Sequence, residues 1–413
     1  KNYKVISVIG DGALTGGMAF EALNNATRLE KNFIIVLNDN NMSISENVGG
    51  LSNHLNRLRT AEGYHDLKEG VMNSLVKIPV YGEWMVEQVR RAKSGIKQLV
   101  IPGMIYENMG ITYLGPVDGH NIDELIRITE DALKIEHPVL IHVLTKKGKG
   151  YRNAEKDPGK FHGIGKFDPE TGKVLASADK PTYSKVMGDY LTELAEKDSR
   201  IVAITAAMGD ATGLGGFAEK YPERFFDVGI AEQHAVTFAA GLAKAGMRPF
   251  VCIYSSFLQR AYDQILEDVC MQELPVTFMI DRAGIVGADG ETHHGIFDLS
   301  YLATMPHLSV LAPTSDETLR ESMHYAMEQG GPCAIRYPRG EVMTEEEGRI
   351  PSLMYYNRTM EYGNTLLADR VEILGVGKMA GTGREVFVRL LEKGVQARYQ
   401  DVNIVKPIET SIN

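Results

Sequence analysis

Short apolar runs alternate with amphipathic stretches along most of this chain. Four runs in the first part are mostly apolar, which is typical of strands buried on both faces of a parallel sheet. They are Lys4 to Ile9, Phe33 to Leu37, Ile111 to Leu114 and Val139 to Leu144. Leu51 to Leu99 instead mixes charged and apolar residues at helical spacing, which favours plain packing helices over a lid.

A polar stretch, Ala176 to Pro181, precedes a second series of alternating strands and helices. The expected strands are 200–205, 249–254, 276–280, 309–313 and 333–337, with helices from Ala231, from Gln259, near Phe297 and from Glu317. A last set has strands at Val371 to Leu374 and Ala397 to Val402 around a helix from Gly381 to Lys393. The pattern predicts an α/β fold with two doubly wound, mainly parallel-sheet domains, at 1–178 and 179–345, and part of a third α/β domain at 346–413.

The first predicted strand begins a few residues after Lys1, and the sheet predicted for 1–178 has few strands. A parallel sheet needs both faces covered and its edges protected. We therefore expect the first domain to be incomplete on its N-terminal side. The last predicted elements likewise make up only part of a domain, so we expect a fragment of a longer protein.

Polar residues follow the first two predicted strands at the point where each strand ends. Gly10-Asp11-Gly12 follows the first, and Asn38-Asp39-Asn40 follows the second. In a parallel sheet these ends share one edge, so Asp11 and Asn40 can converge beside a helix N-terminus, where oxygen ligands suit Mg²⁺ carrying a diphosphate. The glycine spacing does not fit the dinucleotide fingerprint. A tight turn capped by Asp11 and a polar loop is the alternative.

GDG followed by NDN resembles the thiamine-diphosphate signature of transketolase-like enzymes, and NMSISENVGGLS is similar, more narrowly, to the 1-deoxy-D-xylulose-5-phosphate synthase family. GIVGADGETHHGIFDLSYL carries the same resemblance further along the chain. The resemblance implies that Asp11, Asn40 and the carbonyl of Met42 are Mg²⁺ ligands. It also implies that Gly12, Ala13 and Asn40 contact the cofactor, and that a family segment precedes this chain.

A helix that is apolar nearly all round, and that we therefore expect to be buried, is predicted from Ala231 to Ala243, with Glu232 in its first turn. An acid there complements the helix dipole. A carboxyl group in apolar surroundings also has a raised pKa and can share a proton with a ligand nitrogen. The resemblance implies the second role, with Glu232 as a catalytic and cofactor-binding residue that hydrogen-bonds the aminopyrimidine ring of thiamine diphosphate.

Lys146, Lys147 and Lys149 lie among glycines after a predicted strand. This cationic loop suits an anionic ligand at the same sheet edge, or it is a solvated charge run. The resemblance implies that the following Tyr151 contacts the cofactor and that His162 is catalytic.

Several arginines follow the ends of strands in the second series, and guanidinium groups bind phosphate in bidentate fashion. Arg336 is the exception that we expect to be structural. The adjacent histidines His293 and His294 lack further ligands at zinc-like spacing. The resemblance implies that Phe257 stacks on the pyrimidine, although an aromatic residue there also suits a core, and that His293 is catalytic. It implies that the phosphorylated substrate is bound by Tyr254, Arg260, Arg282 and Arg339.

The chemistry that the resemblance implies is decarboxylation of pyruvate and transfer of its two-carbon unit to D-glyceraldehyde 3-phosphate. The products would be 1-deoxy-D-xylulose 5-phosphate and CO₂, on a route to isoprenoids, thiamine and pyridoxal. Two alternatives stay open. One is a transketolase-type ketol transfer, and the other is a truncated, catalytically dead chain that binds cofactor or partners only.

The 413 residues carry a formal net charge of −10 without an acidic block, which favours a soluble protein that does not bind nucleic acid. No apolar run reaches membrane-spanning length, so we expect no membrane association. Cys252, Cys270 and Cys333 are odd in number and lack a CxxC pair, which indicates reduced core residues in a cytoplasmic protein. The resemblance implies a bacterial homodimer.

Overall fold

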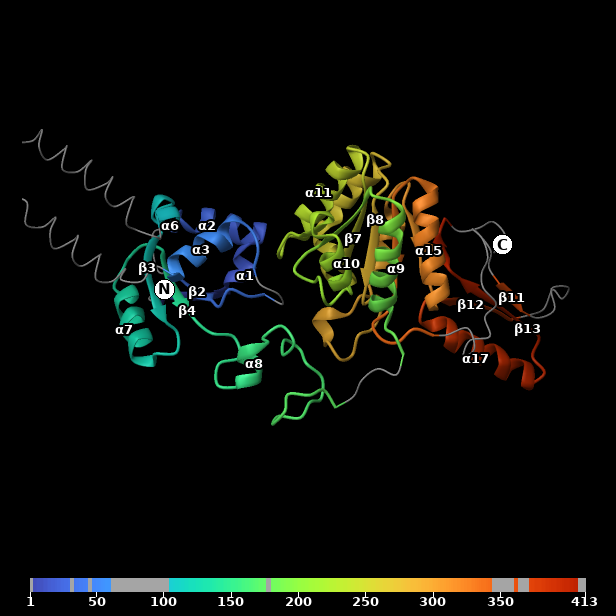
Figure 1. The fold of residues 1–413 in the computed structure, drawn as a ribbon, viewed down its shortest axis with the longest axis horizontal. Coiled ribbons are helices and arrows are strands. Elements are labelled where there is room, and N and C mark those ends of the chain that lie inside the picture. The colour runs from blue at the N-terminus through green and yellow to red at the C-terminus, as the bar shows by residue number, and fades with distance from the viewer. Residues whose placement is uncertain are drawn as a thin grey trace, which may run out of the picture. The chain divides into compact units, whose positions relative to one another are not determined.

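The computed structural model describes residues 3–29, 33–43, 47–60, 104–175, 180–343, 360–362 and 371–407. The chain divides into two compact units, Lys1–His162 and Gly163–Asn413, and each is described by itself. Mainly parallel sheets with helices on their faces (Figure 1) confirm the predicted α/β class. The domain limits at 178 and 345 stay a prediction.

Unit 1 contains a four-stranded parallel sheet in the order β1-β2-β4-β3. Its strands are β1 (Val5–Gly10), β2 (Phe33–Asp39), β3 (Thr112–Asp118) and β4 (Val139–Leu144), in agreement with the four predicted runs. Its helices are α1 (Asp11–Leu14), α2 (Gly17–Ala26), α3 (Gly50–Thr60), α6 (Met104–Asn108), α7 (Ile122–Leu133) and α8 (Arg152–Lys156). Only α3 represents the helices expected between Leu51 and Leu99, and the remainder of that stretch lies outside the described residues.

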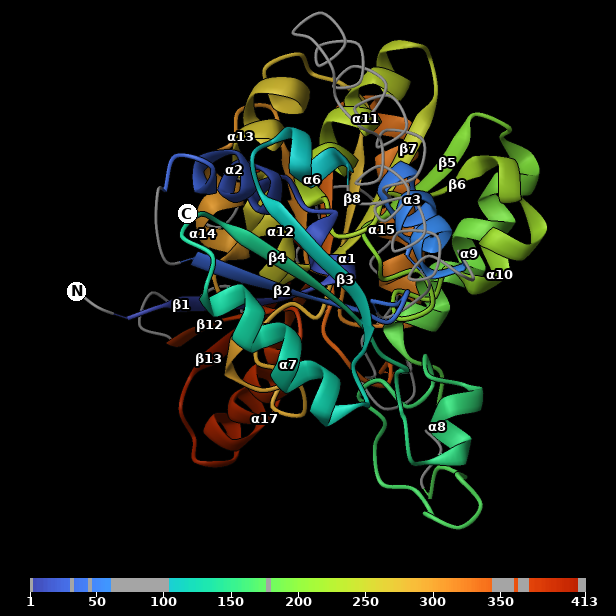
Figure 2. The same cartoon turned by 90° about the vertical axis from the view of Figure 1, so that its left-hand side faces the viewer.

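Helices lie on both faces of the unit 1 sheet. Along β2, successive side chains alternate between the faces, so Ile35 packs among α1, α2, α3 and α6, whereas Ile34 packs beneath α7. Figures 1 and 2 show α7 on one side and α2, α3 and α6 on the other. This double coverage buries most of β2 and β4, whereas most side chains of the edge strand β1 are exposed, in contrast to the burial predicted for it.

Unit 2 contains a seven-stranded sheet in the order β14-β9-β10-β8-β7-β5-β6, in which only β14 is antiparallel to its described neighbour. Its strands are β5 (Ile201–Thr205), β6 (Phe225–Asp227), β7 (Arg248–Tyr254), β8 (Thr277–Asp281), β9 (Ser309–Leu311), β10 (Cys333–Arg336) and β14 (Ile404–Lys406). The main helices are α9 (Tyr183–Lys197), α10 (Gly215–Lys220), α11 (Glu232–Lys244), α14 (Asp298–Thr304) and α15 (Asp316–Gln329). The core on one face joins α9, α10 and α15.

Two local features differ from the expectations for this part. The helix expected from Gln259 is a broken series that starts earlier: α12 (Ser255–Leu258), the 3₁₀ turn η2 (Gln259–Ala261), α13 (Tyr262–Gln264) and the π-helix η3 (Ile265–Cys270). Helix α11 is buried along one face only, through residues such as Ala235 and Ala239, and Thr237 on another face is exposed.

The last elements form a three-stranded sheet in the order β11-β13-β12. Its parts are β11 (Met360–Tyr362), β12 (Val371–Val376), β13 (Ala397–Val402) and the helix α17 (Met379–Glu392). The chain then returns to the sheet of unit 2, because β14 pairs with β9.

Candidate functional site

The predicted metal ligands meet at one edge of the unit 1 sheet. Strands β1 and β2 are parallel, with Gly10 opposite Asn38, so Asp11 and Asn40 both lie just beyond the strand ends. Asp11 is 2% exposed, and burial raises the pKa of its carboxyl group. Backbone amides of Asn40 and Asn41 donate hydrogen bonds to that carboxylate and oppose the shift. The Asp11 carboxylate thus directly contacts the turn that carries Asn40.

Gly12 lies at a close approach between the two loops. A Cβ atom on Gly12 would be 2.9 Å from Ser43 Cβ and 3.0 Å from Asn47 Oδ1. Asn47 in turn donates from Nδ2 to Asp11 Oδ2 over 2.8 Å. Only glycine fits this position without displacing its neighbours. Ala13 is exposed one residue further along α1.

Lys147, from the predicted lysine loop, lies close to Ser43 and Asp11. The Lys147 ammonium donates a hydrogen bond to the Ser43 carbonyl. Burial lowers the pKa of Lys147, and the negative charge of Asp11 opposes this shift. The pKa of His162 is lowered, first by partial burial and then by the charge of Lys147. Of the three predicted loop lysines, Lys147 is therefore the one that lies within electrostatic reach of both Asp11 and His162.

Tyr151 precedes α8, where its ring packs edge-on against Phe161 with centroids 5.4 Å apart. Its hydroxyl group accepts a hydrogen bond from Asn153 Nδ2 over 3.0 Å. The structure thus gives Tyr151 local packing partners within the loop that leads to His162.

The predicted proton-sharing acid begins α11 in unit 2. Glu232 is 3% exposed, and Arg260 Nη1 lies 2.7 Å from its Oε2. Burial raises the pKa of Glu232, whereas its own backbone amide and the charge of Arg260 lower it. Among the described residues, Glu232 Oε2 has no partner with hydrogen-bond geometry. The Arg260 contact is therefore an ion pair that leaves this oxygen able to hydrogen-bond a ligand.

An aromatic group forms beyond the end of β7. Tyr254 and Phe257 stack with ring centroids 5.5 Å apart, and His293 meets Phe257 edge-on at 5.2 Å. Thr292 Oγ1 lies 2.9 Å from His293 Nδ1. The structure thus brings together three of the residues predicted for the second domain.

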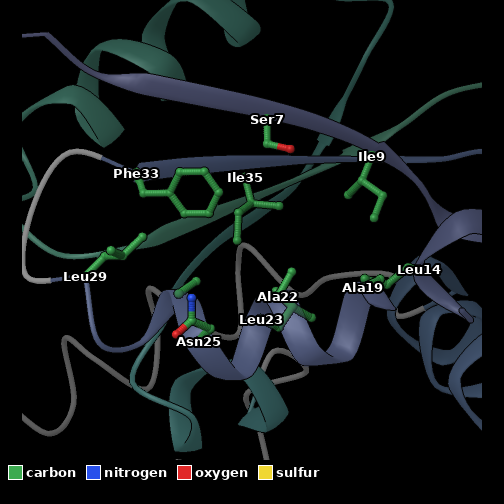
Figure 3. A pocket seen from close by; sticks show the side chains of 11 residues that line it. Ser7, Ile9, Leu14, Ala19, Ala22, Leu23, Asn25, Leu29, Phe33 and Ile35 are labelled. Carbon is green, nitrogen blue, oxygen red and sulfur yellow. The ribbon is translucent and has the colours of Figure 1, made fainter. Parts of the chain in front are cut away.

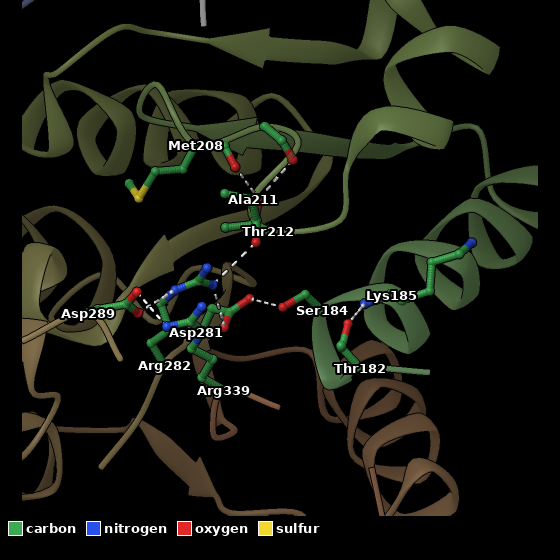
Figure 4. Close-up of polar contacts among 11 residues, drawn as sticks. Thr182, Ser184, Lys185, Met208, Ala211, Thr212, Asp281, Arg282, Asp289 and Arg339 are labelled. Atoms are coloured by element: carbon green, nitrogen blue, oxygen red, sulfur yellow. Dashed lines mark hydrogen bonds and ion pairs between the residues drawn. The ribbon is translucent and has the colours of Figure 1, made fainter. Parts of the chain in front are cut away.

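Arg282 and Arg339 share one carboxylate (Figure 4). Arg339 Nη1 donates to Asp289 Oδ1 over 2.5 Å, and Arg282 Nε lies 3.4 Å from Asp289 Oδ2. The Arg282 guanidinium also lies over the Tyr254 ring, 3.8 Å from its centroid. Two guanidinium groups around one anion form the arrangement that a phosphate group requires.

The fully buried carboxylate of Asp281 accepts a hydrogen bond from the Arg282 side chain. Arg282 Nη1 donates to Asp281 Oδ1 and to the Ala211 carbonyl, both over 3.2 Å. Ser184 Oγ donates to Asp281 Oδ2 over 2.6 Å. Burial raises the pKa of Asp281, and the charge of Arg282 opposes this. Arg282 has a φ of +58°, so these contacts hold a backbone conformation that arginine rarely adopts.

Two other polar residues have local partners. Arg336 Nε donates to Asp298 Oδ2 over 2.9 Å in a largely buried ion pair, as expected for a structural arginine. His294 Nδ1 accepts the backbone N–H of Val286 over 3.0 Å. In the part of the chain that the structure describes, no three His, Cys, Asp or Glu side chains are grouped to hold a metal ion.

An apolar cavity of about 260 Å³ lies elsewhere in unit 1, between α2 and the strands β1 and β2 (Figure 3). Its lining includes Ile9, Leu23, Phe33 and Ile35. None of the predicted site residues lines this cavity, so it is not part of the candidate site.

Comparisons with known proteins define the class first. Residues 1–145 match the family model described as 1-deoxy-D-xylulose-5-phosphate synthase, and residues 179–344 match the pyrimidine binding domain of transketolase. The fold is similar to that of a transketolase from Campylobacter jejuni, with a TM-score of 0.50 and 16% identity over 99% of this chain and 68% of the other. The chain is thus transketolase-like.

The particular family follows from sequence relatives. The chain is 52% identical over 413 residues to the 1-deoxy-D-xylulose-5-phosphate synthase of Natranaerobius thermophilus, covering 99% of this chain and 65% of the relative. It is 56% identical over 409 residues to that of Clostridium kluyveri, with the same two coverages. Over nearly its whole length, the chain is similar to members of the 1-deoxy-D-xylulose-5-phosphate synthase family. It spans a little under two thirds of the length of these curated relatives.

None of the helices in the described ranges is both long and apolar enough to cross a membrane.

Proposed function

We propose that this protein uses Mg²⁺ and thiamine diphosphate to transfer a two-carbon unit from pyruvate to D-glyceraldehyde 3-phosphate, giving 1-deoxy-D-xylulose 5-phosphate and CO₂. The observation that carries the proposal is the buried Glu232 carboxyl group at the start of α11, whose Oε2 lacks an aligned hydrogen-bond partner among the described residues. The names of the relatives support the same reaction.

The residues at the unit 1 edge fit a metal-bound diphosphate. Asp11 and Asn40 offer side-chain oxygens, the Met42 carbonyl offers another, and hard oxygen donors are what Mg²⁺ prefers. Gly12 and Ala13 lie in the first turn of α1, where backbone N–H groups are available to an anion. Lys147, close to Asp11, adds a positive charge. We therefore assign the metal to Asp11, Asn40 and Met42. We assign the diphosphate to Gly12, Ala13 and Lys147.

The residues of unit 2 suit the pyrimidine ring and the acceptor. Bound thiamine diphosphate supplies the electron sink for breaking the bond next to the pyruvate carbonyl. Glu232 hydrogen-bonds a ring nitrogen and holds or releases a proton there, and Phe257 offers a ring face for stacking. Since Arg260 pairs with Glu232, we assign Arg260 to the cofactor end rather than to the substrate phosphate.

Arg282 and Arg339 bind the phosphate of the acceptor, with Tyr254 beside them. Asp289 now lies between the two guanidinium groups, so a phosphate group would have to replace this carboxylate. His293, in edge contact with Phe257, is our candidate for proton transfer at the substrate. In unit 1, we assign His162 as a catalytic residue and Tyr151 as a cofactor contact. A homodimer in the bacterial cytoplasm is part of the same proposal.

A panel of donors tests the proposal. The protein is incubated with D-glyceraldehyde 3-phosphate, Mg²⁺ and thiamine diphosphate, and with either pyruvate or a phosphorylated ketose. We expect CO₂ release and a new ketose phosphate with pyruvate only. Consumption of the phosphorylated ketose without CO₂ release from pyruvate would establish a transketolase-type transfer instead. No turnover of either donor by a protein of verified intact mass would identify a catalytically inactive chain.

A further inference from the structure

Three buried, hydrogen-bonded side chains adjoin the turn that contains Asn40. They come from neighbouring strands of unit 1: Asp39 ends β2, His142 lies in β4 and Tyr113 lies in β3. Their exposed fractions are 0%, 0% and 4%. Polar side chains this deeply buried are costly unless each is hydrogen-bonded, so their arrangement requires an explanation.

In this hydrogen-bonded triad, each hydrogen bond is donated in the direction from Tyr113 through His142 to Asp39. His142 Nε2 lies 2.9 Å from Asp39 Oδ2, and His142 Nδ1 lies 2.7 Å from the Tyr113 hydroxyl oxygen. A carboxylate only accepts, so Nε2–H donates to Asp39, and in a neutral ring Nδ1 accepts from the Tyr113 hydroxyl group. Tyr113 also packs edge-on against the imidazole, with centroids 5.8 Å apart. These contacts fix both the tautomer and the orientation of His142.

The other carboxylate oxygen of Asp39, Oδ1, is hydrogen-bonded to the turn that contains Asn40 and Asn41. Asp39 Oδ1 accepts the backbone N–H of Asn41 over 3.2 Å, and the Asp39 carbonyl accepts the N–H of Thr145 over 2.8 Å. Asn41 has a φ of +63°, a left-handed conformation that asparagine adopts more readily than most non-glycine residues. Its carbonyl accepts the Asn47 N–H over 3.1 Å. Asp39 therefore connects the sheet to the turn that carries Asn40 and Asn41.

This turn presents the Asn40 side chain and the Met42 carbonyl, and Met42 N–H donates to Asn40 Oδ1 over 3.0 Å. Mutation of groups that orient metal ligands typically lowers metal affinity or activity by about 10-fold to 100-fold. We propose that Tyr113, His142 and Asp39 are positioning residues that hold the Asn40–Met42 turn in its cation-binding conformation. This inference rests on the proposed Mg²⁺–thiamine diphosphate site.

Metal affinity distinguishes positioning from simple fold stabilisation. His142→Phe keeps the ring volume but removes both hydrogen bonds, and Tyr113→Phe removes only the hydroxyl group. Ile141→Val is the matched control, because it deletes one buried methyl group from β4 and packs in the core beneath α7. Each protein is titrated with Mg²⁺ at saturating thiamine diphosphate by calorimetry, and its thermal unfolding is recorded without metal.

We expect His142→Phe to raise the Kd for Mg²⁺ by roughly 10-fold to 100-fold. Tyr113→Phe should raise it less, and Ile141→Val should leave it unchanged although its unfolding temperature falls. If His142→Phe does not fold, Tyr113→Phe decides. Unchanged Mg²⁺ affinity in the folded variants would overturn the inference and leave the proposed function intact. An unmodified protein that bound no Mg²⁺ and cofactor would overturn both.

Discussion

Arg260 Nη1 lies 2.7 Å from Glu232 Oε2, yet this contact lacks the alignment of a hydrogen bond. The carboxyl group is buried, so it has lost water without gaining an aligned partner for that oxygen among the described residues. Such a group is costly for folding, and a ligand nitrogen would satisfy it. We therefore expect substitution of Glu232 to have the clearest effect on turnover.

Glu232→Gln keeps the size of the side chain but removes its ability to exchange a proton. We expect kcat to fall by about 100-fold or more, since positioned acid–base groups contribute on that scale. Affinity for thiamine diphosphate should change much less, and calorimetry would check this. A variant that retained full kcat would exclude Glu232 from proton sharing.

Gly12→Ala should weaken cofactor binding, because its Cβ atom would meet Ser43 Cβ at 2.9 Å and Asn47 Oδ1 at 3.0 Å. The neighbouring loop must shift, and Asn47 also contacts Asp11. The matched control is Gly17→Ala in the first turn of α2, where the nearest atom would be Glu21 Oε1 at 3.9 Å. We expect a rise of about 10-fold or more in the Kd for thiamine diphosphate for Gly12→Ala only, from a loss of about 1.4 kcal/mol or more. Equal affinities in both variants would show that the close approach is irrelevant to binding.

Arg339→Ala should raise KM for the phosphorylated aldehyde by about 10-fold or more, because a charged hydrogen bond to phosphate contributes about 1.5–3 kcal/mol. KM for pyruvate should stay unchanged. Arg336→Lys serves as a control from the same segment, since its partner is the buried Asp298. That control should lower the unfolding temperature and leave KM for the aldehyde unaltered. The assignment fails if the two variants change KM alike.

Asp401 gives a prediction about stability and pH. Burial raises the pKa of this carboxyl group to about 6, against the opposing effects of Thr314 and Arg384. A raised pKa in the folded state means that stability is fully present below the unfolded value of 3.8 and is lost as pH rises towards 6. Asp401→Asn should therefore stabilise the protein more at pH 8 than at pH 5, by about 1 kcal/mol. Denaturant unfolding at the two pH values measures this, and an equal effect at both would contradict the shift.

Sequence patterns predicted the positions of β1 to β4, although β3 extends to Asp118, beyond the predicted end at Leu114. They also predicted that Asp11 and Asn40 lie at one sheet edge, because parallel pairing imposes this. β6 was not predicted, as its three residues lie within the motif around Glu232 and are too short to show a period. The break into η2 and η3 was missed for a similar reason, because π-helical and 3₁₀ turns leave no distinct apolar spacing.

Side-chain partners between distant segments were beyond sequence reasoning. Nothing in the spacing of Glu232 and Arg260 indicates an ion pair, and this contact changes the role that we propose for the arginine. Asp289 bridges two arginines, and nothing in the sequence spacing indicates this contact. His142 lies within an apolar run, and only the register of β2 and β4 brings it beside Asp39.

The most direct measurement uses pyruvate labelled with ¹³C at its carboxyl group. We predict that ¹³CO₂ and 1-deoxy-D-xylulose 5-phosphate form in equal amounts when D-glyceraldehyde 3-phosphate, Mg²⁺ and thiamine diphosphate are all present. We also predict that Glu232→Gln abolishes most of both products under identical conditions. Absence of labelled CO₂ from the unmodified, intact protein, or equal product yields from the Glu232→Gln variant, would contradict the account.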